Sequence, residues 1–349
     1  MKRCPSCHTD YGTDAQFCTK DGARLMAAGD PAPNVCAAAP HAAAGGEMPT
    51  DSAMVGRVLD GRYLVEKKVG EGGMSFVYLA TELGTRQPRA IKILSAALSQ
   101  DSSAMAQLKR QAGLGMRLAH PNVCHIIRVG ETEDGLVYVV MPFVEGELLS
   151  DRNNRVGHVP LDETVRLVQG MAAGLHVAHE LNIVHRDLKP ENVMVYERPD
   201  GTEWPVVMDF GRAKGRRAGP ELQRLTATGV IMGTAEFMGP EQLRGKPLDA
   251  RTDIYSLSLL TYEMLTSRLP FQGPTPQELM ISRLRSDPIP LRKMRPDLDF
   301  PEAVERVFNE AMARNPDERP GTTLDLANGL AAGAGDGRGV GPMGQGFGR

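Results

Sequence analysis

The stretch His185-Arg-Asp-Leu-Lys-Pro-Glu-Asn-Val193 decides most about this chain. It places an acid, Asp187, a cation, Lys189, and a carboxamide, Asn192, within one short loop. A carboxylate can accept a hydroxyl proton, a lysine can neutralise phosphate, and an amide oxygen can bind Mg²⁺. Farther along, Asp209-Phe210-Gly211 supplies a second hard oxygen ligand for such a cation. The spacing indicates a phosphoryl-transfer site.

Two motifs on the N-terminal side complete this pattern. Gly70-Glu-Gly-Gly-Met-Ser-Phe-Val-Tyr78 is glycine-rich between two strand-like runs, so its backbone N–H groups can approach a phosphate closely. Ser75 stands where the usual G-x-G-x-x-G pattern has its third glycine. Ala90-Ile-Lys92 puts a lysine in an apolar strand, within reach of the α- and β-phosphates.

In these motifs the chain resembles the bacterial branch of the eukaryotic-like serine/threonine protein kinases, across roughly residues 56–330. The family's other motifs follow in order: His120-Pro-Asn122, Gly233-Thr-Ala-Glu-Phe-Met-Gly-Pro-Glu241, Asp253-Ile-Tyr-Ser-Leu257 and Arg319-Pro320. Lys189 within Asp-Leu-Lys-Pro-Glu-Asn is similar to serine/threonine rather than tyrosine kinases.

The resemblance implies a role for each site residue. Asp187 would be the catalytic base, with Lys189 and Lys92 acting on the phosphates. Mg²⁺ or Mn²⁺ would lie on Asn192 and Asp209. ATP would contact the glycine-rich loop, the strand lysine and the hinge, where Met141 resembles the gatekeeper: Gly70, Glu71, Gly72, Gly73, Met74, Ser75, Val77, Ala90, Lys92, Met141, Pro142 and Val144. The Pro142 carbonyl and the Val144 N–H would face adenine.

The expected fold class is α+β, a bilobal kinase fold. Short β-branched runs predict an antiparallel sheet from residue 62 to 94, with a further strand over 136–144, and helical patterns dominate after Leu161. A hairpin over 193–211 should turn at Pro199-Asp-Gly201. By resemblance, Glu241 and Arg319 form a buried ion pair, and Asp253 supports the catalytic loop.

The composition predicts four segments. Residues 1–25 form a zinc-ribbon-like module, 26–55 a flexible linker rich in Ala, Pro and Gly, 56–330 the kinase domain, and 331–349 a disordered Gly-rich tail.

One departure from the family concerns the helix after Lys92. Gln111 takes the place of the glutamate that normally pairs with the strand lysine. Replacing a charge-assisted hydrogen bond with a neutral one loses about 1–2 kcal/mol. Such a loss slows the reaction roughly tenfold if it falls wholly on the barrier. The alternative reading is a nucleotide-binding pseudokinase scaffold. Gly239 in place of the family's alanine and a long hairpin before Asp209 are milder departures.

The segment after Asp209 carries candidate regulatory sites. Thr226 and Thr228 lie at the family's phosphosite spacing, and Arg186 precedes the catalytic acid. A phosphate on either threonine adds about 1.5–2 negative charges, which Arg186 can bind. We expect phosphorylation to order this segment; the alternative is that both are plain loop threonines.

The N-terminus suggests a metal site. Cys4-x-x-Cys7 and Cys18-x-x-Asp21 resemble the two knuckles of a zinc ribbon whose fourth cysteine has become an aspartate. Zinc accepts carboxylate oxygen, and His8 is a rival fourth ligand. The alternative is a tail with idle thiols. A third reading of the chain, a nucleic-acid binder with a vestigial kinase domain, remains open.

The composition limits which partners are expected. A formal net charge of -3 gives no argument for nucleic acid or an anionic membrane, and no apolar run approaches the roughly 20 residues of a membrane span. We expect a cytoplasmic protein that acts on protein substrates with ATP and forms a dimer for trans-autophosphorylation. Cys124 is expected to be a buried small hydrophobe.

Overall fold

The computed structural model describes residues 2–3, 10–11, 26–27, 54–72, 75–210 and 236–336. Contacts divide the chain into two units, Met1–Gly46 and Glu47–Arg349. The predicted zinc ligands Cys4, Cys7, Cys18 and Asp21 lie outside the described residues, as do the rival His8 and the predicted phosphosites Thr226 and Thr228.

The first unit contains a small antiparallel sheet. β1 (Lys2–Arg3) is the central strand and pairs with β2 (Asp10–Tyr11) and β3 (Met26–Ala27). β3 begins within the segment that the sequence predicts as linker. That boundary is therefore wrong at its start, because Met26 and Ala27 pair with Arg3 and Lys2.

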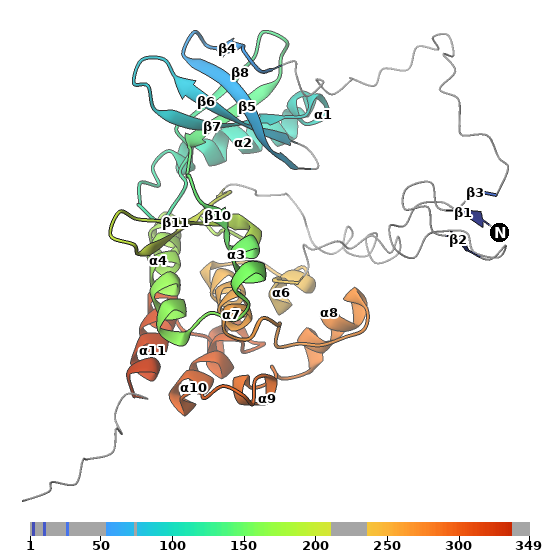
Figure 1. Ribbon diagram of the computed structural model, residues 1–349, viewed down its shortest axis with the longest axis vertical. Coiled ribbons are helices and arrows are strands. Elements are labelled where there is room, and N and C mark those ends of the chain that lie inside the picture. The colour runs from blue at the N-terminus through green and yellow to red at the C-terminus, as the bar shows by residue number, and fades with distance from the viewer. Residues whose placement is uncertain are drawn as a thin grey trace, which may run out of the picture. The chain divides into compact units, whose positions relative to one another are not determined.

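The second unit opens with a six-stranded antiparallel sheet in the order β4-β5-β6-β7-β9-β8 (Figure 1). Its strands are β4 (Val58–Leu59), β5 (Tyr63–Gly72), β6 (Ser75–Glu82), β7 (Pro88–Leu94), β8 (Arg128–Glu131) and β9 (Val137–Pro142). The predicted strands are confirmed. β4 and β8 were missed, because both are short and lack an apolar run.

Alternation along the strands builds the core of this lobe. Tyr63, Tyr78, Ile91 and Tyr138 are all almost fully buried on one face of the sheet. Met54 is only 1% exposed and packs into the same cluster, although the sequence assigns it to the linker. The lobe therefore begins before residue 56, since burying this side chain favours an ordered segment.

Two helices follow β7, namely α1 (Ala96–Gln100) and α2 (Ser102–Gly115). Met105 clusters with Leu94 of β7 and Val137 of β9, and Ala112 clusters with Ile126 and Val139. α2 is therefore attached to the sheet beside the strand that carries Lys92.

The remaining helices form the second lobe, with a small sheet of β10 (Glu147–Leu148), β11 (Val193–Glu197) and β12 (Glu203–Val207) at its top (Figure 1). The helices are α3 (Leu149–Val156), α4 (Leu161–Glu180), α6 (Pro240–Leu243), α7 (Ala250–Thr266), α8 (Pro276–Arg285), α9 (Leu291–Met294), α10 (Glu302–Ala311) and α11 (Thr323–Asp336), with single 3₁₀ turns η1 (Pro190–Asn192) and η2 (Pro316–Glu318).

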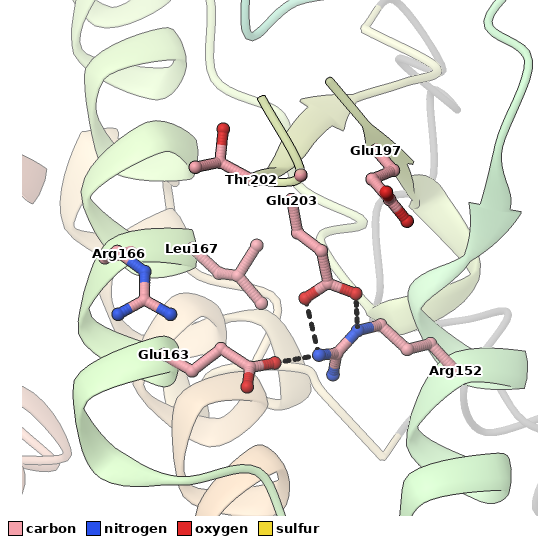
Figure 2. A pocket seen from close by; sticks show the side chains of 8 residues that line it. Arg152, Glu163, Arg166, Leu167, Glu197, Thr202 and Glu203 are labelled. Atoms are coloured by element: carbon pink, nitrogen blue, oxygen red, sulfur yellow. Dashed lines mark hydrogen bonds and ion pairs between the residues drawn. The ribbon is translucent and has the colours of Figure 1, made fainter. Parts of the chain in front are cut away.

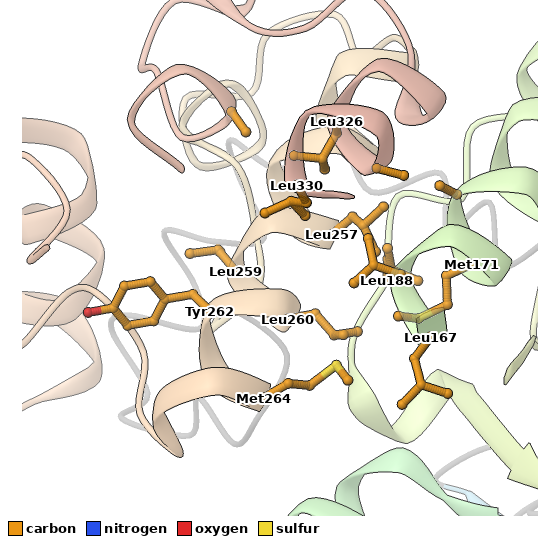
Figure 3. Close-up of a cluster of buried hydrophobic side chains, with 14 of the residues drawn as sticks. Leu167, Met171, Leu188, Leu257, Leu259, Leu260, Tyr262, Met264, Leu326 and Leu330 are labelled. Carbon is orange, nitrogen blue, oxygen red and sulfur yellow. The ribbon is translucent and has the colours of Figure 1, made fainter. Parts of the chain in front are cut away.

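The core of this lobe is built around α7. Nearly all of its residues from Thr252 to Thr266 are buried, as expected for a helix surrounded by others. Figure 3 shows its leucines meeting side chains of α4 and α11, with Leu188 of the catalytic loop among them. Leu188 is 1% exposed, so the core holds the residue directly after Asp187.

The last helix corrects a second boundary. α11 extends past residue 330 to Asp336, where the sequence predicts a disordered tail. Ala331 and Ala334 pack against the lobe core, and alanine is the best helix former, so the helix continues. Among the helices that the structure describes, none combines the length and apolar character needed to cross a membrane.

Candidate active site

The catalytic loop is held from below by Asp253 near the start of α7. This carboxylate is fully buried and accepts hydrogen bonds from the backbone N–H groups of His185 (2.7 Å) and Arg186 (2.8 Å). Nε2 of His179 lies 2.8 Å from the same carboxylate. Burial raises the pKa of Asp253, but the bonds from His179 and the Arg186 N–H outweigh it and leave the pKa lowered. The predicted support by Asp253 is confirmed.

Asp187 and Asn192 contact each other within the loop. Nδ2 of Asn192 donates to the Asp187 carbonyl at 2.6 Å and approaches its carboxylate at 3.3 Å. Because the amide nitrogen faces Asp187, the amide oxygen remains the acceptor end of this side chain. The Asn192 side chain is thus anchored to Asp187 through its nitrogen.

The β11–β12 hairpin brings Asn192 beside Asp209. β11 begins at Val193, which pairs with Val207 at the end of β12, and the Met208 N–H donates to the Asn192 carbonyl at 2.9 Å. The hairpin turns at Gly201, whose φ of 78° favours glycine. Nε2 of His185 lies 2.8 Å from the Met208 carbonyl, and its ring meets Phe210 edge-on at 4.8 Å. The catalytic loop and the segment around Asp209, which the hairpin separates in the sequence, are therefore neighbours in the fold.

Lys92 reaches this cluster from the other lobe. It lies on β7 with Val77 and Val139 as its register partners. Its Nζ is 2.6 Å from Oδ1 of Asp209, and both side chains are largely shielded from solvent. Asp209 has a φ of 59°, an uncommon conformation for a residue other than glycine. The backbone at Asp209 thus turns sharply where the ion pair forms.

The predicted nucleotide loop includes the end of β5 and the start of β6, and the predicted hinge begins at the end of β9. In the sheet, β7 lies between β6 and β9. Gly70 is opposite Val77, and Met141 is opposite Ala90. Glu71 pairs with Lys68 at 2.8 Å, and Ser75 is buried opposite Gly72. Gly73, Met74 and the side chain of Gln111 lie outside the described part of the chain.

Cys124 is buried beside the hinge, as the sequence predicts. Its Sγ lies 3.6 Å from the Pro142 carbonyl. Burial, helped by the Asp209 carboxylate, raises the pKa of the thiol to about 12. A thiol with this pKa stays protonated at neutral pH and is a poor nucleophile.

The ion pair predicted between Glu241 and Arg319 is confirmed. Both guanidinium nitrogens Nη1 and Nη2 lie 2.8 Å from the two carboxylate oxygens, and both side chains are buried. Burial raises the pKa of Glu241, but Arg319 outweighs it, so the pKa is lowered. The pair ties α6 to the segment before α11.

A third carboxylate, that of Glu263, has its pKa raised, whereas the pKa values of Asp253 and Glu241 are lowered. Glu263 on α7 has its pKa raised to about 7, first by burial and then by the charges of Glu191 and Glu236. Glu191 lies in the turn that follows Lys189, and Glu236 directly precedes Phe237. Like charges therefore gather on the side of α7 that faces the catalytic loop.

Figure 2 shows the side chains that line a cavity in the helical lobe. It has a volume of about 400 Å³ and is lined by α3, α4 and the β11–β12 hairpin. Arg152 is 4% exposed and binds Glu203 through Nε (2.7 Å) and Nη2 (2.6 Å), and Nη2 also binds Glu163. These bonds tie the hairpin to both helices. The residues that line this cavity do not include Lys92, Asp187 or Asp209.

Comparison with known proteins agrees with this geometry. The model of the protein kinase domain matches residues 63–328. This chain belongs to the protein kinase family. It is 35% identical to the serine/threonine-protein kinase Pkn3 of Myxococcus xanthus over 78% of this chain and 50% of that protein. It is 34% identical to the serine/threonine-protein kinase PknB of Mycobacterium leprae over 77% of this chain and 42% of that protein.

Solved structures agree on the kinase fold. The PknI kinase domain of Mycobacterium tuberculosis is 25% identical with a TM-score of 0.61, over 80% of this chain and 98% of that one. Rad53 residues 1–466 in complex with AMP-PNP is also 25% identical, with a TM-score of 0.62 over 76% of this chain and 64% of that one. The predicted α+β bilobal fold is confirmed. The chain spans half or less of the length of the two curated relatives, Pkn3 and PknB.

Sequence reasoning missed the residues that position the site from outside its motifs. His179, on α4, and Gln242, on α6, both contact groups that bear directly on the catalytic loop. Neither stands in a motif quoted above, and each meets its partner only after the chain folds. For His179, the only signal in the sequence is the motif residue Asp253, with which it pairs in the fold.

Proposed function

We propose that this kinase transfers the γ-phosphoryl group of ATP to serine or threonine hydroxyls of proteins. The observation that carries the proposal is the convergence of Lys92, Asp187, Asn192 and Asp209, which arrive from both lobes. Its serine/threonine kinase relatives and the AMP-PNP complex of Rad53 support it.

The residues divide the work as follows. The Asp187 carboxylate orients the substrate hydroxyl and accepts its proton, while Lys189 neutralises charge on the transferring phosphoryl group. Lys92 binds the α- and β-phosphates. The glycine-rich loop from Gly70 to Val77 covers the phosphates, and the Pro142 carbonyl and Val144 N–H bind adenine beside Met141. Catalysis would rest on positioning and electrostatics.

The donor set fits magnesium or manganese. Asn192 offers an amide oxygen, because its nitrogen is bonded to Asp187, and Asp209 offers a carboxylate. When held by Asn192 and Asp209, the metal would neutralise the negative charge of the phosphates. Asp209 now pairs with Lys92, so binding of nucleotide and metal would require this 2.6 Å contact to rearrange.

The test is incorporation of labelled phosphate from ATP with Mg²⁺ or Mn²⁺, comparing wild type with Asp187→Asn. We expect incorporation by the wild type alone. Gln169→Glu changes an exposed residue of α4 and serves as the control for effects of substitution and purification that do not involve the site. Clear ATP binding without any incorporation would sink the kinase proposal.

A pseudokinase scaffold is the second candidate. It is favoured by Gln111 in the place of a glutamate and by the pairing of Lys92 with the acid that would hold the metal. The retention of Lys92, Asp187, Asn192 and Asp209 argues against it. A Gln111→Glu variant that gains activity from an inactive wild type would favour the scaffold.

Phosphorylation of Thr226 or Thr228 is proposed to order the activation segment through Arg186. The Arg186 side chain is exposed at the loop surface, where a phosphate could reach it. Mapping of the incorporated label by mass spectrometry tests this regulation. Full activity in the Thr226→Ala/Thr228→Ala double variant contradicts it.

A zinc ion on Cys4, Cys7, Cys18 and Asp21, with His8 as the rival ligand, is proposed for the first unit. The pairing of β1 with β2 and β3 supports it, because a segment this short and polar rarely folds without a staple. One zinc per chain, lost in Cys18→Ser, is expected from elemental analysis. A metal-free wild type contradicts it.

The setting of the reaction is also a proposal. We infer a cytoplasmic enzyme whose partners are protein substrates and a second copy for trans-autophosphorylation, with no role for nucleic acid. The net charge of -3 supports the last point. Mixing active enzyme with a tagged Asp187→Asn copy tests trans-phosphorylation directly, since label on the tagged copy can come only from its partner.

A further inference from the structure

The peptide group between Arg186 and Asp187 is held at both ends by side chains. Its N–H, from Asp187, donates to Nδ1 of His185 at 3.3 Å. Its carbonyl, from Arg186, accepts from Nε2 of Gln242 at 2.8 Å. This peptide unit carries the Asp187 Cα directly, so its orientation sets where the carboxylate points.

The backbone here adopts a strained conformation. Arg186 has a φ of 67°, in the left-handed region that side chains other than glycine disfavour. Asp253 binds the N–H on one side of Arg186, and Gln242 binds the carbonyl on the other. Without both partners the peptide could relax toward a commoner conformation.

Gln242 is itself fixed by its surroundings. It is 6% exposed, and its Oε1 accepts from the Gly239 N–H at 3.0 Å. Since the amide oxygen is engaged at Gly239, the amide nitrogen must face Arg186. One side chain thus connects the catalytic loop to the backbone just before α6.

That backbone is braced in turn. The Phe237 carbonyl accepts from Ser256 on α7 at 2.8 Å, and the Met238 carbonyl accepts from the fully buried Arg283 on α8 at 2.9 Å. The segment 236–239 is therefore a rigid support, and Gln242 passes its position to the peptide that precedes Asp187.

We infer that Gln242 is a positioning residue of the phosphoryl-transfer site, whose amide orients the Arg186–Asp187 peptide and so aims the Asp187 carboxylate. This inference rests on the proposed kinase activity. It differs from that proposal because Gln242 touches neither substrate nor phosphate and acts only through Arg186.

Two variants of the full chain test the role. Gln242→Glu keeps an acceptor for the Gly239 N–H but loses the donor to Arg186. Because a buried carboxyl could bind a proton and restore that donor, Gln242→Met removes both bonds at similar volume. Gln169→Glu on α4 is the matched control.

The measurements are kcat with dephosphorylated casein as acceptor, the dissociation constant of a fluorescent ADP analogue, and amide exchange of peptides that cover residues 185–192. In Gln242→Met we expect kcat to fall roughly tenfold, as loss of one aligning hydrogen bond in the transition state predicts. ADP affinity should stay unchanged, and exchange of the loop should accelerate. The control should match the wild type.

Two outcomes overturn the inference. One is a wild-type kcat and wild-type exchange in Gln242→Met. The other is a parallel loss of ADP affinity, kcat and melting temperature, which would mean that the residue only supports folding. If the wild type itself transfers no phosphate, the proposed function fails, and the exchange comparison still decides whether Gln242 orients the loop.

Discussion

The two halves of the active site are held in different ways. On the side of the base, buried groups hold the loop around Asp187: Asp253 accepts hydrogen bonds from its backbone N–H groups, and Asn192 donates to the Asp187 carbonyl. On the side of the phosphates, Lys92 forms an ion pair with Asp209. The first arrangement can persist when ligand binds, whereas the second uses a carboxylate that the metal would need.

This difference teaches where the site is preorganised. A group that is already aligned before the reaction needs no reorganisation in the transition state. By this criterion the half of the site around Asp187 is preorganised. The lysine half must exchange partners on binding nucleotide. We therefore expect changes around Asp187 to affect the resting protein, and changes around Lys92 to appear mainly with ATP.

The largest effect should follow from removing the carboxylate under the base half. Asp253→Ala leaves two backbone N–H groups and His179 without their acceptor, which should cost about 3–5 kcal/mol in the free energy of unfolding. Urea denaturation measures this cost, and phosphorylation should be nearly abolished.

The pH dependence of the same variant sharpens the test. Because the folded pKa of Asp253 is lowered, its contribution is present above the ordinary value of 3.8 and is lost as pH falls through the folded pKa. The difference between wild type and Asp253→Ala should therefore shrink in acid. Asp162→Ala, at an exposed pair with Arg166, should change stability by less than about 1 kcal/mol. Equal losses in both variants would contradict the special role of Asp253.

A second carboxylate on α7 should act in the opposite direction. The pKa of Glu263 is raised to about 7, so the folded protein is destabilised as pH rises from 4.5 through 7. Glu263→Gln should add about 2–3 kcal/mol to the free energy of unfolding at pH 8, and little at pH 4. Melting curves across this range measure it. A pH-independent effect, or the same gain from the exposed Glu302→Gln, would argue against this electrostatic cause.

A carboxylate at position 111 should increase the activity of the half of the site that contains Lys92. Gln111→Glu should raise kcat/KM for ATP up to roughly tenfold, because a carboxylate binds a lysine more strongly than a neutral amide does. Initial rates at varied ATP concentration measure this gain. No gain, with Gln169→Glu equally silent, would indicate that Asp209 alone sets the position of Lys92.

The smallest effect is expected outside both halves. Arg152→Met breaks the bonds to Glu163 and Glu203, but these carboxylates are partly exposed and can be rehydrated, and methionine keeps the packing of the stem. We expect a loss of about 1 kcal/mol in stability with an unchanged kcat. A kcat that falls in Arg152→Met would show that the hairpin position controls Asn192 and Asp209.

Much of the site could be predicted from the sequence because kinase chemistry uses short contiguous motifs. Asp187, Lys189 and Asn192 stand within one loop, and the strand patterns around Lys92 and the hinge locate the sheet. Segment boundaries were less accurate. Met54 was assigned to the flexible linker and the helix end at Asp336 to the disordered tail, since burial of a methionine and packing of alanines depend on neighbours that composition does not reveal.

The sequence by itself determined the family and the two-lobed class and led to the proposed reacting groups, because these inferences depend on residue type at fixed spacing. Only the tertiary structure decided which groups support them. His179 meets Asp253, Gln242 meets Arg186, and Lys92 meets Asp209 across large separations in the chain. Such contacts are set by how helices and strands pack, and a single side chain carries no local signal of the partner it will find.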